Sequence, residues 1–338
     1  MKKRILSCFM ALALCLTLLP ATALAAEPHT HCLCGAKHNS EIKTHAEDTK
    51  IPFETKLYSE SGTYDWRIQK QQNSSTKLTL TDKQWVLPAG NYYLYDGSEA
   101  SVFFTEHTIK IQGDVTICLN GKQIKKTKGD ATPVFEVPSG FTLTLTDCKT
   151  DGKVTCGTTS SDSGSGVYVS GGTFNLYEGQ ITGNKGQENE NTDRCGGGVY
   201  VSGGTFNMYG GAITENTASY GGGVYVKSGT FNMNGGTITK NTSDKGGGDG
   251  SGYACSKITE AKNIVIRDHA TVVAKNTGLG AAIGAASVGN GEVTIGTDGA
   301  TAEQEDVHVT ATGFRGSAIG NGAKDTKVTI QGHSTIRM

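Results

Sequence analysis

The sequence predicts an all-β fold, a right-handed parallel β-helix, from three observations. A Gly-, Thr- and Asn-rich unit repeats along the chain, its apolar residues alternate in twos, and glycines interrupt the alternation at regular places. Gly accounts for 47 of the 338 residues and Pro for only 6, a balance that without a collagen period is common in disordered chains. The regular recurrence of the glycines argues against disorder.

The repeat is clearest in three stretches that align residue by residue. They read GVYVSGGTFNLYEGQITGN from Gly166, GVYVSGGTFNMYGGAITEN from Gly198 and GVYVKSGTFNMNGGTITKN from Gly223. Equivalent residues lie 32 and then 25 residues apart, and the difference corresponds to one excursion, GQENENTDR, from Gly186 to Arg194. Such a unit cannot bury its apolar face alone, so we expect the units to stack on one another.

Within each repeat, apolar and polar residues alternate as they do in β-strands. Val199 points to one side and Tyr200 to the other, and further along Phe206 points inward and Asn207 outward. Glycines supply corners where a positive φ has no steric cost. Three short strands in a unit of 25 residues suit a right-handed parallel β-helix, whose coils advance about 4.8 Å each. A barrel or propeller, the alternative, would need antiparallel hairpins and would not stack identical residues. The expected core consists of Val167, Phe174, Leu176, Ile181 and their equivalents two coils on.

An asparagine closes the Ile-Thr-x-Asn segment of each of these coils. These residues are Asn184, Asn216 and Asn241. Asn tolerates a bend, and its amide can bond to the same residue one coil above and below, so we assign them a structural role. The position before them holds Gly183, Glu215 and Lys240, and this variation argues against a catalytic groove there.

Residues 1–25 have the order of a secretory signal peptide. MKKR precedes the apolar run ILSCFMALALCLTLL, and the segment closes on Ala-Leu-Ala, which predicts cleavage after Ala25. The run of 15 residues is shorter than the roughly 20 that a spanning helix needs, which disfavours a membrane anchor. We therefore expect an extracellular protein, either secreted or attached to the cell surface.

The charge and cysteine content of the mature chain restrict its partners and its chemistry. Without the signal it carries 28 Lys and Arg against 32 Asp and Glu, a net charge of −4, which argues against nucleic acid or anionic lipid as a partner. We expect no membrane insertion after signal removal, and a monomer. Seven cysteines remain, an odd and scattered set that is no disulfide framework, although export permits individual bridges.

Four regions follow from these patterns. They are the signal peptide at 1–25, a His/Cys-rich segment at 26–50, an irregular N-terminal cap at 51–106 and the β-helix at 107–338. The cap assignment rests on the aromatic stretch WVLPAGNYYLYDG and on the need to shield the first coil. Because the chain stops at VTIQGHSTIRM, inside a repeat, we expect the natural protein to continue beyond it.

The phrases AGNYYL, GDVTICLNGKQI, GFTLTLTD and GGGVYVSGGTFNMYGGAITENTA resemble a known group. This group is the pectin-lyase-like right-handed β-helix repeats of secreted and surface proteins of anaerobic Gram-positive bacteria, and the likeness covers most of Trp85 to Asn276. ITENTASYGGGVY also resembles the repeats of chlamydial polymorphic outer-membrane adhesins, but it carries Ile213 where they have Phe, and Gly223-Val224 where they have Ala-Ile. The second resemblance implies adhesion, although a repeat motif specifies a fold better than an activity.

Many right-handed β-helices are polysaccharide lyases or hydrolases, so we looked for catalytic residues. Hydrolysis needs carboxylates on neighbouring coils, and the NTD motif ending at Asp193 matches one polygalacturonase motif without the Asp-Asp pair that should follow. Asp249, Arg267, Asp268 and His269 come nearest to a lyase-like cluster, which we interpret as turn and surface chemistry. No catalytic residue is assigned, and the balance is against an enzyme.

A His/Cys cluster follows the signal peptide. In HTHCLCGAKH the candidate metal ligands are His29, His31, Cys32, Cys34 and His38. Thiolate and imidazole groups at this density suit a tetrahedral zinc site in a segment too short for a core. Cys-x-Cys is tighter than the usual Cys-x-x-Cys, and oxidation of the thiols outside the cell is the competing interpretation.

Tyr168, Tyr200 and Tyr225 are expected to project outward from one strand on successive coils. Stacked rings stabilise such a ladder, and exposed aromatic faces on a flat sheet also grip sugar rings. We take this face as the candidate ligand-binding surface. The leading function is an adhesin-like β-helix that binds extracellular glycans or proteins without a cofactor. The alternatives are a polysaccharide lyase or glycoside hydrolase whose site lies partly beyond this chain, and a passive surface stalk.

Overall fold

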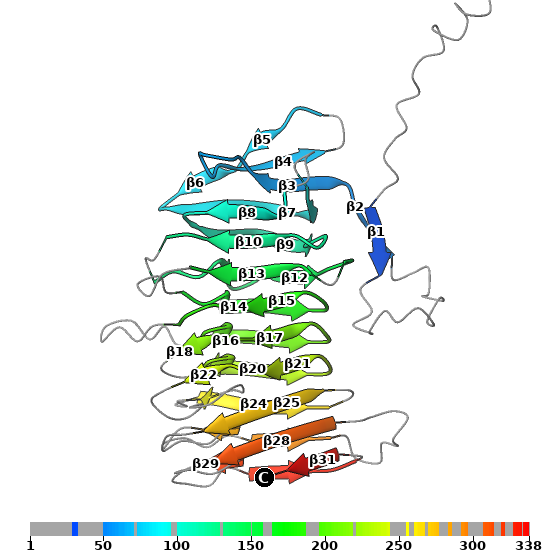
Figure 1. Cartoon of the computed structure of the whole chain (residues 1–338), viewed down its shortest axis with the longest axis vertical. Coiled ribbons are helices and arrows are strands. Elements are labelled where there is room, and N and C mark those ends of the chain that lie inside the picture. The colour runs from blue at the N-terminus through cyan, green and yellow to red at the C-terminus, as the bar shows by residue number, and fades with distance from the viewer. Residues whose placement is uncertain are drawn as a thin grey trace, which may run out of the picture.

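The structure is a computed structural model. It describes residues 29–32, 50–70, 73–95, 100–128, 131–149, 151–157, 164–186, 196–218, 221–243, 255–256, 260–267, 270–276, 283–285, 292–296, 307–313, 319–321, 327–332 and 334–337. Every regular element of these residues is a β-strand. Most of the strands form one column of stacked coils, with β3 (Thr55–Ser59) to β6 (Thr79–Thr81) at one end and β31 (Ser334–Arg337) at the other, while β1 (His29–Cys32) lies beside the column (Figure 1).

One side of the column is a nine-stranded sheet in which neighbours are parallel. Its strands are β8 (Val102–Thr105), β10 (Gln123–Lys126), β13 (Lys153–Cys156), β15 (Gln180–Thr182), β17 (Ala212–Thr214), β21 (Thr237–Thr239), β25 (Thr271–Asn276), β28 (Val307–Gly313) and β31 (Ser334–Arg337). In the three aligned coils, β15, β17 and β21 carry the Gln-Ile-Thr, Ala-Ile-Thr and Thr-Ile-Thr segments.

The other strands of the coils form a second, larger sheet. It contains β7 (Gln84–Leu94), β9 (Thr108–Cys118), β11 (Phe135–Val137), β12 (Thr142–Thr146), β14 (Val167–Leu176), β16 (Val199–Met208), β19 (Val224–Val226), β20 (Ser228–Met233), β23 (Cys255–Ser256), β24 (Glu260–Ile266), β26 (Ile283–Ala285), β27 (Glu292–Ile295), β29 (Ile319–Asn321) and β30 (Lys327–Ile330). A short parallel pair, β18 (Thr217–Ala218) and β22 (Thr242–Ser243), follows the ladder asparagines.

Equivalent residues of the repeats lie side by side in register. Val167 pairs with Val199, which pairs with Val224, and the phenylalanines and isoleucines of the same coils pair in the same way. All these pairings are parallel, whereas a barrel of hairpins or a propeller would need antiparallel neighbours. The predicted parallel β-helix is therefore confirmed.

The interior of the column is a continuous stack of like residues. The rings of Phe174 and Phe206 lie 4.9 Å apart with 15° between their planes, and those of Phe206 and Phe231 lie 4.7 Å apart with 7°. All three side chains are fully buried, as are Val167, Ile181 and their equivalents. The predicted core and the inward direction of Phe206 are confirmed.

A ladder of asparagine amides runs through the interior at one corner. Asn184 Nδ2 donates to Asn216 Oδ1 at 2.8 Å, and Asn216 Nδ2 donates to Asn241 Oδ1 at 2.8 Å. The same oxygens accept the backbone N–H groups of Asn184 and Asn216 at 3.0 Å. This ladder satisfies backbone groups that leave the sheet at the corner, so the predicted structural role is confirmed.

The backbone turns left-handed just before each ladder asparagine. Gly183, Glu215 and Lys240 have φ values of 67°, 58° and 55°. This conformation favours Gly over Glu and Lys, but the side chain at this position is exposed in all three coils, so packing does not dictate its identity. The variation noted in the sequence therefore follows from exposure.

Glycine is required where successive coils approach most closely. A Cβ on Gly222 would lie 2.2 Å from the carbonyl oxygen of Thr242, and one on Gly197 would lie 2.4 Å from the carbonyl oxygen of Gly222. Both distances are far below a van der Waals contact. The Gly-Gly-Gly segments that precede β16 and β19 therefore permit the coils to stack at the spacing of hydrogen-bonded strands.

The N-terminal strands differ from the rest because they pair mainly antiparallel. They are β1 (His29–Cys32), β2 (Lys50–Phe53), β3 (Thr55–Ser59), β4 (Trp66–Lys70), β5 (Thr76–Lys77) and β6 (Thr79–Thr81). β4 pairs with β3 and β5, and β6 pairs with β7, while β3 also joins β7 in parallel. Trp66, in β4, is fully buried. Strands β3 to β6 lie at the N-terminal end of the column, where a cap was expected, and are called the cap strands below (Figure 1). The parallel stack begins before the expected boundary at residue 107, because β7 and β8 already pair with the next coil.

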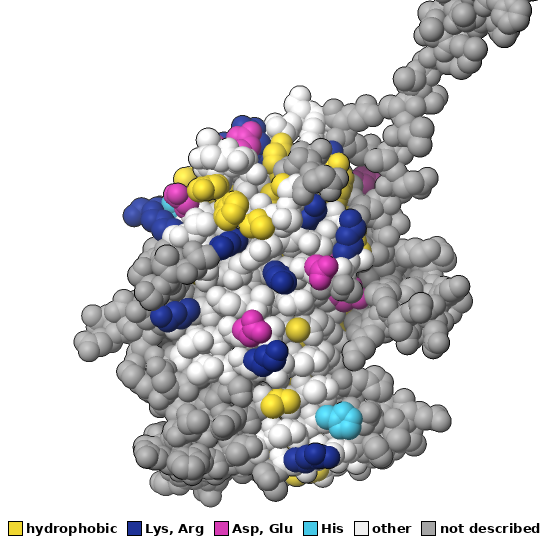
Figure 2. Space-filling model, viewed as in Figure 1, with side chains coloured by type: hydrophobic (Ala, Val, Ile, Leu, Met, Phe, Trp, Pro, Cys, Tyr) yellow, Lys and Arg dark blue, Asp and Glu magenta, His cyan; other side chains and the backbone are white. Residues whose placement is uncertain are grey.

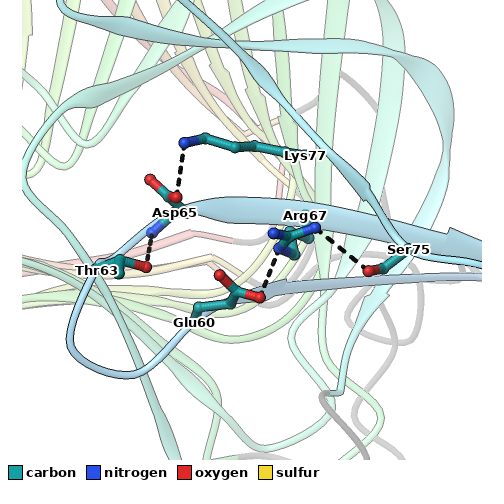
Figure 3. A network of polar contacts seen from close by, with 6 residues as sticks. All are labelled: Glu60, Thr63, Asp65, Arg67, Ser75 and Lys77. Atoms are coloured by element: carbon teal, nitrogen blue, oxygen red, sulfur yellow. Dashed lines mark hydrogen bonds and ion pairs between the residues drawn. The ribbon is translucent and has the colours of Figure 1, made fainter.

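Ion pairs and hydrogen bonds connect neighbouring cap strands on their outer surface (Figure 3). Arg67 Nε lies 2.7 Å from Glu60 Oε1, and its guanidinium also donates to Ser75 at 3.4 Å. Lys77 Nζ lies 2.6 Å from Asp65 Oδ2. These partly exposed pairs contribute little to stability individually.

Candidate functional site

The most distinctive surface feature of the column lies at the corner where β14 leads to β15 and at the equivalent corners of the following coils. Just past the strand, each coil donates one more backbone N–H to the coil before it, so the parallel hydrogen bonding extends into the corner. These bonds run from Tyr209 N to Leu176 O, from Asn234 N to Met208 O and from Arg267 N to Met233 O, at 2.7–2.8 Å. Successive coils consequently place four side chains in one line. This set, Tyr177, Tyr209, Asn234 and Arg267, is called the corner stripe below.

The corner stripe combines stacked aromatic rings with polar groups. The rings of Tyr177 and Tyr209 lie 4.6 Å apart with 20° between their planes, and both side chains are half-buried. Arg267 Nε donates to Asn234 Oδ1 at 2.7 Å, and Arg267 is exposed. A guanidinium has five N–H donors, so Arg267 retains donors beyond the one bonded to Asn234. Aromatic faces beside amide and guanidinium donors form a surface suited to a polyhydroxylated or anionic ligand.

Two carboxyl groups on adjacent coils adjoin one end of the corner stripe. Because Leu145 pairs with Leu176, Asp147 and Glu178 occupy equivalent positions two residues further on. Burial, followed by the nearby charge of Asp147, raises the pKa of Glu178 to about 7. Burial also raises the pKa of Asp147, against the lowering effect of the backbone N–H groups of its neighbours.

Asp147 has a structural role at this corner. Its Oδ1 accepts the backbone N–H of Gly121 from the preceding coil at 2.7 Å, and its Oδ2 accepts that of Gly152 at 2.7 Å. The residue is 2% exposed. Its carboxyl group is therefore engaged in holding two turns together, whereas Glu178 is a half-buried residue whose Oε2 atom is buried.

Among the coloured residues of Figure 2, charged side chains do not gather into one patch. Lys, Arg, Asp and Glu side chains lie scattered there among uncharged polar atoms, while hydrophobic side chains gather toward the N-terminal end. A pocket of about 590 Å³ lies near that end, between the cap and the first coil, and its lining includes Glu54, Lys70, Asn73 and Tyr92. Tyr92 Oη donates to Pro88 O at 2.9 Å, and burial raises its pKa to about 12.

The tyrosine ladder expected as the binding surface forms, but two of its rings are covered. The ring centroids of Tyr168 and Tyr200 lie 5.1 Å apart, and those of Tyr200 and Tyr225 lie 5.3 Å apart, one ring per coil. Tyr200 and Tyr225 are each only 3% exposed, so the expectation of an exposed aromatic face is wrong for them. The glycine segment before each strand contributes to this burial, because its backbone packs against the tyrosine. A Cβ on Gly196 would lie only 2.9 Å from the Tyr200 Cβ. Binding by these three tyrosines stays a prediction, and only Tyr168 is half-buried.

Most of the candidate metal and catalytic residues lie outside the part of the chain that the structure describes. His29, His31 and Cys32 belong to β1, which pairs antiparallel with β2, whereas Cys34 and His38 fall outside the described residues. Zinc binding therefore stays a prediction. Asp193, Asp249, Asp268 and His269 also fall outside. Within the described residues, no group of three or more His, Cys, Asp or Glu side chains is arranged to hold a metal ion.

Sequence reasoning missed the corner stripe, although a signal for it existed. Tyr177, Tyr209 and Asn234 each follow the last inward residue of the Thr-Phe-Asn strand, so they align when the three repeats are superposed. Asn207, predicted to point outward, belongs to a second asparagine ladder on that strand, in which Asn207 Nδ2 donates to Asn175 Oδ1 and Asn232 Nδ2 donates to Asn207 Oδ1, both at 2.9 Å.

Comparison with known proteins does not assign the chain to a family. Among the residues that the structure describes, no helix is long and apolar enough to cross a membrane. No protein-family model matches the sequence, and neither a curated protein nor a solved structure matches it.

Proposed function

We propose that this chain is an extracellular, adhesin-like β-helix that binds glycans along the corner stripe. The observation that carries the proposal is the stacked, half-buried pair Tyr177 and Tyr209 in line with the bonded pair Asn234 and Arg267. The signal-like N-terminus supports a location outside the cell, and the likeness to pectin-lyase-like β-helix repeats supports a saccharide as the ligand class.

The chemistry of the corner stripe fits a saccharide chain laid along the column. A sugar ring offers an apolar face to an aromatic ring and hydroxyl groups to amide and guanidinium donors. Stacked strands repeat at about 4.8 Å, so each coil adds one contact in the same direction. Arg267 at one end gives the corner stripe a preference for saccharides that carry carboxylate or sulfate groups.

The test is a glycan array probed with the full chain lacking residues 1–25. In the double variant Tyr177→Ser, Tyr209→Ser we expect binding to weaken by at least about tenfold, since each ring contributes its buried area plus a stacking term. Tyr168→Ser is the matched control, because Tyr168 lies in the same coil as Tyr177 but outside the corner stripe, and it should bind as the unmodified chain does.

Three results would count against the proposal. Loss of binding in Tyr168→Ser together with full binding by the double variant would move the site to the tyrosine ladder. Equal binding by all variants would mean that these tyrosine rings do not contribute to glycan binding. No binding to any glycan by the unmodified chain would favour a protein ligand or a passive stalk.

A glycoside hydrolase is the second candidate, and the raised pKa of Glu178 is the observation in its favour. A carboxyl group that titrates near pH 7 is suited to act as a general acid. Its neighbour Asp147, however, is buried and accepts backbone N–H groups on both sides, so the corner offers at most one carboxyl group for catalysis where hydrolysis needs two. We expect no turnover of pectin, polygalacturonate or glycosaminoglycans. Cleavage that disappears in Glu178→Gln would establish the enzyme instead.

A further inference from the structure

Two cysteines from adjacent coils meet at the corner that carries the corner stripe. Cys118 is the last residue of β9, and Cys148 follows β12, the strand of the next coil. Cys118 pairs with Thr146 across the two strands, and Cys148 lies two residues further along the turn. Their Sγ atoms are 3.6 Å apart, so the two sulfur atoms are in contact.

We propose that Cys118 and Cys148 form a disulfide bond that links these two coils covalently. A disulfide has an S–S distance of about 2.05 Å, so the sulfur atoms need to approach by only about 1.5 Å, within reach of small side-chain rotations. The bond would link two neighbouring coils, because Cys148 lies just beyond the strand that pairs with the strand ending at Cys118.

Hydrogen bonds hold the two turns that carry these cysteines. Asp147, next to Cys148, accepts the N–H of Gly121 from the turn that follows Cys118. Asn120 Nδ2 in that turn donates to Leu94 O at 3.1 Å, and its Oδ1 lies 3.6 Å from Cys148 Sγ. These contacts connect both turns to each other and to the neighbouring coil, and they keep the two sulfur atoms close together.

The two thiols also differ in a way that gives the reaction an order. Cys148 is exposed and Cys118 is buried. The Cys148 thiolate attacks a disulfide of an external oxidant, such as oxidised glutathione or a thiol–disulfide oxidoreductase, and one thiol of the oxidant leaves. Cys118 then loses its proton, attacks the Cys148 sulfur and releases the second thiol. The two cysteines lose two electrons and two protons, and the oxidant's disulfide gains them.

Peptide mapping of the purified full chain tests the proposal directly. The reduced protein is incubated in a buffer of oxidised and reduced glutathione, unfolded without reductant, alkylated with iodoacetamide and digested. We expect the Cys118 and Cys148 peptides to appear as one linked species, lighter by two hydrogen atoms than the two free peptides together. Incubation with dithiothreitol should separate them and lower the urea midpoint of the unmodified chain.

Variants distinguish this bond from a general effect of reductant. Cys148→Ser should lose the linked species and the effect of dithiothreitol on the midpoint, whereas Cys156→Ser, which changes a buried cysteine in the other sheet, should retain both. Alkylation of both Cys118 and Cys148 after oxidation would overturn the proposal. Linkage of Cys148 to any cysteine other than Cys118 would overturn it equally.

Discussion

The two asparagine ladders provide a matched pair of perturbations, because one runs inside the column and the other outside. Asn216 is fully buried, whereas Asn207 in the same coil is half-buried on the outer face. Each bonds to the asparagine one coil above and one coil below. Replacing either by Ala removes the same chemical group, so a difference in stability arises from the burial of the amide and from the backbone groups that it bonds.

The expected cost follows from the partners that each substitution leaves behind. In Asn216→Ala, the backbone N–H of Asn184 loses its acceptor and the carbonyl oxygen of Ile181 loses a donor. Both backbone groups remain inside the column. A buried polar group left without its partner costs about 1–3 kcal/mol, so the free energy of unfolding should fall by about 2–6 kcal/mol. Asn207→Ala breaks bonds that water can replace and should cost less than about 1 kcal/mol.

Equilibrium urea unfolding measures the two losses, with the slope of the transition as a check that the unfolding reaction is unchanged. Hydrogen–deuterium exchange adds a local readout, because the N–H of Asn184 bonds to Asn216. Its exchange should accelerate in Asn216→Ala and remain slow in Asn207→Ala. Equal losses of stability in the two variants would refute the assignment of the inner ladder as the structural one.

Three further predictions concern the glycines, the core and the pH dependence of stability. Gly222→Ala should lower the free energy of unfolding by about 1–3 kcal/mol, because its Cβ would lie 2.2 Å from Thr242 O. Gly203→Ala is the control, since its Cβ would lie 3.7 Å from its nearest neighbour, and equal urea midpoints of the two variants would contradict the prediction. Phe206→Ala should cost about 3–5 kcal/mol through the cavity left between two stacked rings, and a loss under about 1 kcal/mol in the same assay would be inconsistent with the core described. Because the pKa of Glu178 rises from 4.5 to about 7, the folded chain retains a proton that the unfolded chain releases, so stability should decline as pH rises through that interval and level off above it. Allowing for solvent screening, the difference between pH 5 and pH 8 should be about 1 kcal/mol and should shrink in Glu178→Gln; an unchanged difference in that variant would contradict the assignment.

The fold could be predicted from the sequence because every repeat has its inward apolar residues and its glycines at the same positions. Phe174, Phe206 and Phe231 recur at a fixed distance from the glycines, so only a stack in register satisfies all of them at once. The inward side of a strand follows from alternation alone. The inner and outer asparagine ladders were predictable for the same reason.

The candidate site was less predictable, because alternation says which side a residue faces and not what lies over it. Tyr200 points away from the core, yet it is buried, and glycines outside its strand contribute to that burial. The corner stripe was missed because its members lie in turns and differ in identity, from Tyr177 to Arg267. What they share is a place in the stack, which becomes visible once the coils are superposed.

The constancy of register across coils of unequal length has a practical consequence. Val167 and Val199 pair although 32 residues separate them, and Val199 and Val224 pair across 25. Alignment is thus set by position within a coil and not by distance along the chain, because each coil contacts only its neighbours. A foreign peptide inserted between Gly186 and Gly196 should therefore leave the register of the column unchanged. Insertion at the equivalent corner of another coil would place such a peptide at another level along the column.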